Sequence, residues 1–170
     1  MLTVIGGLPA TGKTTVCAAL ARATRASYLR VDTIETTIVR HSELTHPLGP
    51  VGYAVAHSLA GEQLRLGLDV IVECVNALAV IRDGWLGLAE QAGAGLLEVE
   101  LVCSDRAAHR RRVATRAVDI PDLPLPPWDE IQTREYEPWE RDHLVIDTAV
   151  VGVDSAVATI QRAQTAHTGR

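Results

Sequence analysis

The chain has 170 residues, of which 47% are hydrophobic and 22% are charged, and its formal net charge is −5. This length predicts one cooperative core that buries roughly 70% of the surface of the unfolded chain. No apolar run reaches the roughly 20 residues of a membrane span, and Leu2 to Ile5 is too short for the apolar core of a signal peptide. We therefore expect a single cytoplasmic domain over residues 1–170, without membrane contact or broad nucleic-acid binding.

Short apolar runs alternate with helical patterns along the chain. Strands are predicted at Leu2–Ile5, Tyr28–Val31, Asp69–Glu73, Leu96–Cys103 and His143–Ile146. Helices are predicted at Thr14–Ala23, Thr33–Arg40, Val51–Leu66, Ala79–Gln91, Ser104 to Arg116, Trp128–Tyr136 and Asp154–Ala166, and a loop at His41–Pro50. The alternation predicts an α/β fold with a parallel sheet that is covered on both faces and binds ligands beyond the carboxyl ends of its strands.

A phosphate-binding motif lies between the first strand and the first helix, the context that such a motif requires. It has the form G-x-x-x-x-G-K-[ST], and with the following threonine it comprises Gly7, Leu8, Pro9, Ala10, Thr11, Gly12, Lys13, Thr14 and Thr15. Lys13 is the only lysine in the chain, whereas 15 residues are arginine. Backbone N–H groups of such a loop bind phosphate oxygens, the lysine reaches the β- and γ-phosphates, and the Thr14 hydroxyl ligates magnesium. ATP and Mg²⁺ are therefore the predicted cofactors.

The run from Gly6 to Thr15 resembles the predicted-kinase family often labelled AAA-type ATPases. More broadly, the chain resembles the small P-loop kinases that include chloramphenicol phosphotransferase, gluconate kinase, the kinase domain of polynucleotide kinase and zeta toxin. The resemblance implies a three-layer P-loop kinase fold, with a five-stranded parallel sheet of order 2-3-1-4-5 and a helical, proline-rich lid at approximately residues 105–140.

Asp32 follows the second predicted strand, where the resembling kinases place the aspartate that accepts the proton of the substrate hydroxyl. It can serve as this base or in the magnesium shell. The alternative is an N-cap for the next helix, with Glu35 at capping-box spacing. Relatives often carry arginine where Glu35 stands, and this departure favours a neutral or cationic acceptor over an anionic one.

Glu73 closes the third predicted strand and is the candidate for the second acidic residue of the magnesium shell, beside Thr14 and Asp32. The alternative is an ordinary charge at a strand end. Asn76 could contact the substrate or occupy a turn.

Arg112 and Arg116 are four residues apart and fall on one face of a predicted helix. In the resembling kinases, arginines at this place neutralise charge during transfer, so both are candidate catalytic residues beside Lys13 and Asp32. Arg110 and Arg111 are competing choices, and a solvated basic face is the alternative for each arginine. The proline-rich stretch Pro121–Pro127 is either part of the lid or an irregular surface loop.

Other chemistry-bearing residues favour structural roles. Arg82 could bind the substrate, but a position at the surface is favoured. The aromatic residues Trp128, Tyr136 and Trp139 could stack on a ligand ring, but packing is favoured. The histidines His41, His46 and His57 have no metal-site spacing, and the cysteines Cys17, Cys74 and Cys103 are expected to be reduced and buried.

These features predict an ATP-dependent phosphotransferase that moves the γ-phosphoryl group to a hydroxyl of a small molecule such as an antibiotic, a sugar or a nucleoside. The alternatives are an ATP-binding regulatory module without transferase activity, and a kinase of a nucleic-acid end or of a nucleotide sugar. The expected assembly is a monomer or a homodimer.

Overall fold

A five-stranded parallel sheet forms the centre of the computed structural model, which describes residues 1–168. The strands are β1 (Leu2–Gly6), β2 (Ser27–Arg30), β3 (Val70–Glu73), β4 (Leu96–Val102) and β5 (Leu144–Asp147). Their order is β2-β3-β1-β4-β5, and every neighbouring pair is parallel. The predicted fold class and strand order are confirmed.

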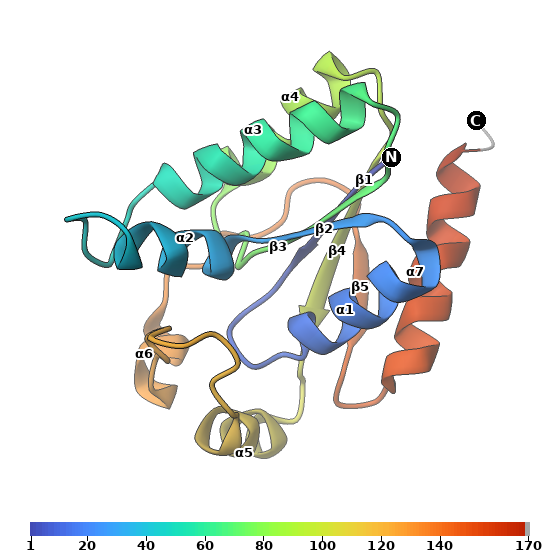
Figure 1. Ribbon diagram of the computed structural model, residues 1–170. Coiled ribbons are helices and arrows are strands. Elements are labelled where there is room, and N and C mark those ends of the chain that lie inside the picture. The colour runs from blue at the N-terminus through green and yellow to red at the C-terminus, as the bar shows by residue number, and fades with distance from the viewer. Residues whose placement is uncertain (169–170) are drawn as a thin grey trace.

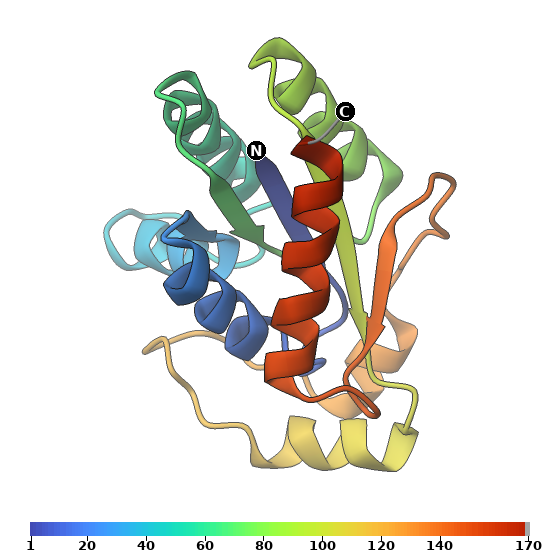
Figure 2. The same ribbon diagram turned by 90° about the vertical axis from the view of Figure 1, so that its right-hand side faces the viewer.

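Helices cover both faces of the sheet and make three layers (Figure 1). They are α1 (Lys13–Thr24), α2 (Val31–Arg40), α3 (Val51–Arg65), α4 (Ala79–Gln91), α5 (Arg106–Thr115), α6 (Trp128–Thr133) and α7 (Val153–Thr168). Helices α3 and α4 lie on one face, and α1 and α7 lie side by side on the other (Figures 1 and 2). The short helices α5 and α6 lie beyond the carboxyl ends of the strands (Figure 1).

Alternation along the strands divides the core into two clusters, because successive side chains point to opposite faces of a sheet. Leu2 and Val4 of β1 pack with residues of α3 and α4, including Trp85. Ile5 points the other way and packs with residues of α1 and α7, including Leu20. All these side chains are fully or almost fully buried. Burial on both faces explains why the strands are continuous apolar runs.

The boundary between β2 and α2 differs from the prediction. Strand β2 pairs with β3 only as far as Arg30, which lies opposite Glu73 at the end of β3. Beyond this point the chain has no ladder partner, and it turns directly into α2 at Val31. Asp32 therefore lies in the first turn of α2. The N-cap is Arg30, without a side-chain hydrogen bond, so the N-cap alternative for Asp32 is wrong.

The segment after β4 also differs. Asp105 caps α5, through a hydrogen bond from the Ala108 N–H at 2.9 Å. The helix ends at Thr115, however, and Arg116 has extended backbone. The chain leaves the helix at this point and runs to Asp119, which pairs with Arg30. Helix α6 is likewise shorter than predicted.

The other predicted elements lie within about two residues of the observed ones, including the loop at His41–Pro50. Cys17 and Cys74 are free thiols and buried, as expected, whereas Cys103 follows the end of β4 and is partly exposed. Among residues 1–168, no helix is long and apolar enough to cross a membrane.

Candidate active site

The phosphate-binding loop connects β1 to α1 at the carboxyl edge of the sheet. Gly7 has a φ of 135°, and a Cβ atom there would lie 2.2 Å from the carbonyl oxygen of Leu101 in β4, so only glycine fits. Gly12 is the N-cap of α1 and gives no side-chain cap, which leaves the first-turn N–H groups of α1 available to an anion.

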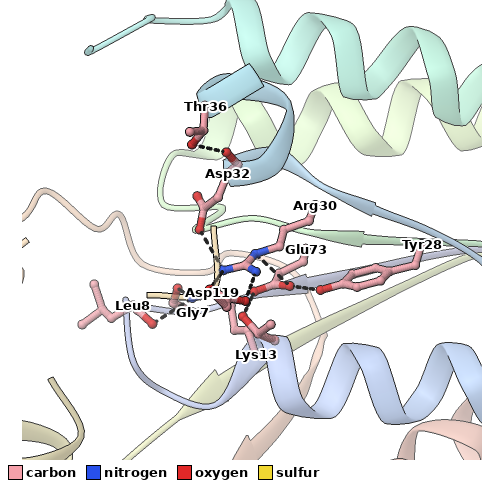
Figure 3. Close-up of polar contacts among 10 residues, drawn as sticks. Gly7, Leu8, Lys13, Tyr28, Arg30, Asp32, Thr36, Glu73 and Asp119 are labelled. Carbon is pink, nitrogen blue, oxygen red and sulfur yellow. Dashed lines mark hydrogen bonds and ion pairs between the residues drawn. The ribbon is translucent and has the colours of Figure 1, made fainter. Parts of the chain in front are cut away.

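Lys13 lies folded against this loop. Its ammonium group donates hydrogen bonds of 2.8 Å to the carbonyl of Gly7 and 2.9 Å to the carbonyl of Leu8 (Figure 3). The side chain is buried, and burial lowers its pKa, although the carboxylates of Glu73 and Asp32 oppose this shift. The positive charge is thus held over the loop by backbone oxygens.

Glu73 is a buried carboxylate at the end of β3, with a partner on each oxygen. The Thr14 hydroxyl donates a 2.6 Å hydrogen bond to Oε1, and the Tyr28 hydroxyl donates to Oε2. The guanidinium of Arg30 lies 3.7 Å from the same Oε2 (Figure 3). Burial, followed by the charge of Glu73, raises the pKa of Tyr28, so the phenol remains a donor. The carboxylate is therefore held at the start of α1.

Arg30 connects the loop region to Asp32 and to the segment after α5. Its guanidinium lies 3.8 Å from the carboxylate of Asp32 and donates to both oxygens of Asp119, at 2.5 and 3.3 Å (Figure 3). Burial by itself lowers the pKa of Arg30, but the hydrogen bond to Asp119 and the charge of Glu73 outweigh it and raise that pKa. The same hydrogen bond lowers the pKa of Asp119. Three carboxylates thus share one arginine.

Arg112 is anchored beside the loop by Thr148, which follows β5. Its guanidinium donates to the hydroxyl and to the carbonyl of Thr148, both at 2.8 Å. The Thr148 hydroxyl is also 2.7 Å from the carbonyl of Thr11 in the loop. One turn earlier in α5, buried His109 places Nε2 2.8 Å from the carbonyl of Pro9. These contacts attach the arginine-rich helix to the phosphate-binding loop.

A cavity of about 1040 Å³ joins these groups. At one end it is lined by residues 9, 10 and 12–15 of the loop, and at the other by Asp32, Glu35 and Tyr53. Residues of the segment between α5 and α6 also line the cavity, among them Leu123, Pro124 and Pro126. This volume is at the upper end of ordinary ligand pockets, which suits two ligands side by side.

The structure brings most of the predicted site residues to this cavity. Its lining includes the predicted residues Pro9, Ala10, Gly12, Lys13, Thr14, Thr15, Asp32, Glu73, Arg112 and Arg116. Gly7, Leu8 and Thr11 are in the same loop, but their side chains or Cα atoms do not line the cavity. The competing arginines Arg110 and Arg111 do not line it either.

Several secondary expectations are decided by burial. Arg82 is 2% exposed, so the expected surface position is wrong. Its guanidinium binds backbone carbonyls, among them that of Pro138 at 2.9 Å, and stacks over the ring of Trp139 at 4.6 Å.

Asn76 is fully buried with a φ of 58° and does not line the cavity, which favours the turn role. The three aromatic residues Trp128, Tyr136 and Trp139 do not line the cavity, as packing predicts.

Among the histidines, His46 lines the cavity, His41 is exposed and His57 lies 3.1 Å from the carbonyl of Gly84. In the described part of the chain, no three His, Cys, Asp or Glu side chains are grouped to hold a metal.

Sequence reasoning missed Arg30, Asp119, Thr148 and His109. For Arg30 a signal existed, because Tyr28 and Arg30 alternate along β2 and share the side that faces Glu73. For the other three, the contacts join segments far apart in the chain, and no local pattern marks them.

Comparison with known proteins gives a family and a fold. The profile of the AAA domain family matches residues 2–138. No curated protein matches the chain. A candidate kinase from Chloroflexus aurantiacus has a similar structure, with 19% identity and a TM-score of 0.72, over 98% of this chain and 96% of that one.

Two further solved structures are named kinases. The gluconokinase of Sinorhizobium meliloti 1021 is 23% identical with a TM-score of 0.64, over 95% of this chain and 91% of its own. The Mycobacterium tuberculosis APS kinase, solved with AMPPNP and APS, is 15% identical with a TM-score of 0.65, over 96% of each chain. These likenesses show a shared fold.

Proposed function

Because the chain belongs to the AAA domain family and has the P-loop kinase fold, we propose that it transfers the γ-phosphoryl group of ATP to a hydroxyl group of a small molecule. The observation that carries this proposal is the single cavity that runs from the phosphate-binding loop to Asp32. A site that only bound ATP would not need a second lined space with a carboxylate beyond the phosphates.

The loop from Gly7 to Thr15 forms the nucleotide end of the proposed site. Its uncapped helix terminus offers N–H donors to phosphate oxygens. Lys13 already lies over the loop, and its ammonium group would exchange carbonyl partners for β- and γ-phosphate oxygens. The low-dielectric setting strengthens this attraction.

The residues at the start of α1 fit magnesium. Thr14 and Glu73 present hard oxygen atoms 2.6 Å apart beside the loop, and Asp32 lines the same cavity. Magnesium is usually held by one or two carboxylates, together with water and substrate phosphates, so a large protein cage is not expected. When bound, the ion would neutralise charge on the β- and γ-phosphates.

Asp32 is the proposed general base. The hydroxyl oxygen of the acceptor forms a bond to the γ-phosphorus, the bond from that phosphorus to the β–γ bridging oxygen breaks, and ADP leaves. The proton of the hydroxyl passes to the carboxylate of Asp32. Its place in the first turn of α2, beside Arg30, holds the carboxylate at the cavity wall.

Arg112 and Arg116 are the proposed lid arginines. Both line the cavity, and Arg112 is held by Thr148 next to the loop. Their positive charges would therefore stabilise the negative charge that develops on the phosphoryl oxygens during transfer. We assign the lid to approximately residues 105–140 of one domain that spans residues 1–170. Two ion pairs, Arg30–Asp119 and Arg40–Asp122, attach its middle to β2 and α2, which would exclude water from the cavity.

A screen of small hydroxyl compounds tests the proposal. Purified protein, ATP and Mg²⁺ are incubated with each compound, and ADP release is measured above the rate without acceptor. We expect at least one compound to stimulate ADP release and to gain a phosphate by mass spectrometry, with no stimulation in Lys13→Ala. Tight ATP binding without stimulation by any compound would instead support a regulatory ATP-binding module.

A further inference from the structure

Glu35 stands at the acceptor end of the cavity. It follows Asp32 by three residues on α2, so the two side chains share one helix face, and both line the cavity. We call the part of the cavity around Asp32, Glu35, Leu48, Tyr53 and Ile81 the acceptor half.

The Glu35 carboxylate has no direct ion-pair partner in the described part of the chain, and Arg134 acts on it only at longer range. Arg30 is paired with Asp119, and Arg134, the other arginine beside the acceptor half, is paired with Glu130 at 3.2 Å. In the described part of the chain, Glu35 makes no hydrogen bond and no ion pair. Burial, and then the charge of Asp32, raise the pKa of Glu35 to about 7, while Arg134 opposes the shift. An uncompensated carboxylate of this kind is costly unless something pairs with it.

The lack of a side chain at Gly52 makes room for the Glu35 side chain. A Cβ atom at residue 52 would lie 2.2 Å from Cγ and 2.6 Å from Oε1 of Glu35, so the first turn of α3 has room for the glutamate only because residue 52 is glycine. The side chain is pressed between α2 and α3 at the cavity wall. Its place there is set by backbone packing.

The surroundings of Glu35 select the charge of a ligand. Leu48 and Ile81 of the acceptor half offer no donor to the carboxylate. An anionic ligand would be repelled, and a neutral one would leave the charge unpaired. The described residues hold no group of three metal-ligating side chains here, which favours an organic cation over a metal ion.

We propose that the acceptor is a hydroxylated amine, whose ammonium group pairs with Glu35 while its hydroxyl faces Asp32. This inference rests on the proposed phosphotransferase function and names the substrate class of the same site. It assigns Glu35 as the residue that selects a cation.

The test uses pairs of compounds that differ in one charge. Amino sugars, aminocyclitols and simple amino alcohols are each compared with their N-acetyl derivatives, which keep the hydroxyls and lose the cation. Wild type is compared with Glu35→Gln and with Gly52→Ala, which keeps the charge but displaces it. Glu90→Gln, at an exposed position in the last turn of α4, is the matched control. Binding in the presence of AMPPNP and acceptor-dependent ADP release are both measured.

We expect wild type and Glu90→Gln to prefer at least one amine over its N-acetyl partner by roughly tenfold or more. The preference should fall to near one in Glu35→Gln and weaken in Gly52→Ala. Preference for neutral or anionic compounds, binding of neither member of any pair, or an unchanged preference in Glu35→Gln would overturn the inference. Transfer to neutral alcohols alone would refute the proposed cation selection but support the phosphotransferase function. Amine-selective binding without ADP release would support the cation site and refute the phosphotransferase function.

Discussion

The hydroxyl of Thr14 donates a 2.6 Å hydrogen bond to the carboxylate of Glu73, across 59 positions of the chain. Thr14 is the second residue of α1, and Glu73 is the last residue of β3, opposite Ile5 in the parallel pairing of β1 with β3. The register of the sheet therefore places an acidic residue at the base of the phosphate-binding loop. This is the pair to which we assign magnesium.

Glu73→Gln should raise the Mg²⁺ concentration needed for half-maximal ADP release by about 10- to 100-fold, because the charge that supports the ion is lost. Tyr28→Phe removes the other hydroxyl bonded to the same carboxylate and should have a smaller effect. Titration of Mg²⁺ at saturating ATP measures both. An unchanged Mg²⁺ requirement in Glu73→Gln would remove Glu73 from the magnesium shell.

Arg112→Ala should lower turnover by about 10²- to 10³-fold with a modest change in ATP affinity, since its charge acts mainly as negative charge spreads. Arg110→Ala is the matched control, because Arg110 is exposed on the same helix. Equal losses in the two variants would point to a general effect of helix charge.

Thr148→Val should lower turnover by about tenfold, since the valine releases Arg112 from its hydroxyl partner and frees the carbonyl of Thr11. Thr148→Ser keeps the hydroxyl and should restore most of the rate. Steady-state kinetics with ATP and acceptor varied separately measures this. Failure of serine to rescue would mean that packing of the threonine methyl is the important contribution.

Asp119→Asn should loosen the segment between α5 and α6 with little effect on global stability. Asp119 is 52% exposed, and ion pairs of this kind contribute at most about 1 kcal/mol. Hydrogen exchange should become faster over residues 117–123, while the unfolding temperature stays nearly constant. Unchanged exchange would show that Arg30 does not hold this segment in place.

Glu35→Gln should make stability less dependent on pH. The pKa of Glu35 is raised to about 7 in the folded state, so the folded protein binds more protons than the unfolded chain between the ordinary glutamate value of about 4.3 and pH 7. Wild-type stability should therefore fall as pH rises through this window. With allowance for solvent screening, we expect Glu35→Gln to be more stable than wild type by about 1–2 kcal/mol at pH 8 and by almost nothing at pH 4. Denaturant unfolding at both pH values measures this difference, and a gap of the same size at both would contradict the assigned pKa.

The sequence was sufficient for the five strands and the phosphate-binding loop, because apolar strands and a glycine–lysine motif are local signals. The strand order came from the resemblance to the small P-loop kinases. The sequence placed Asp32 after a strand and Arg116 within a helix, and both boundaries were wrong. Strand β2 ends where its neighbour β3 ends, and the chain after α5 runs to the ion pair of Asp119 with Arg30, so neither boundary has a local signal. The sequence also placed Arg82 at the surface, because no local pattern shows that four backbone carbonyls surround its guanidinium.

The central claim, that the cavity supports transfer and not binding alone, is tested most directly by Asp32→Asn. ATP affinity and acceptor-dependent phosphoryl transfer are measured on the same preparation, with quenched-flow detection of the phosphorylated acceptor. We predict that ATP affinity stays within about threefold of wild type, while transfer falls by about 10²- to 10⁴-fold, the usual contribution of a general base. Wild-type transfer rates in Asp32→Asn would contradict the account.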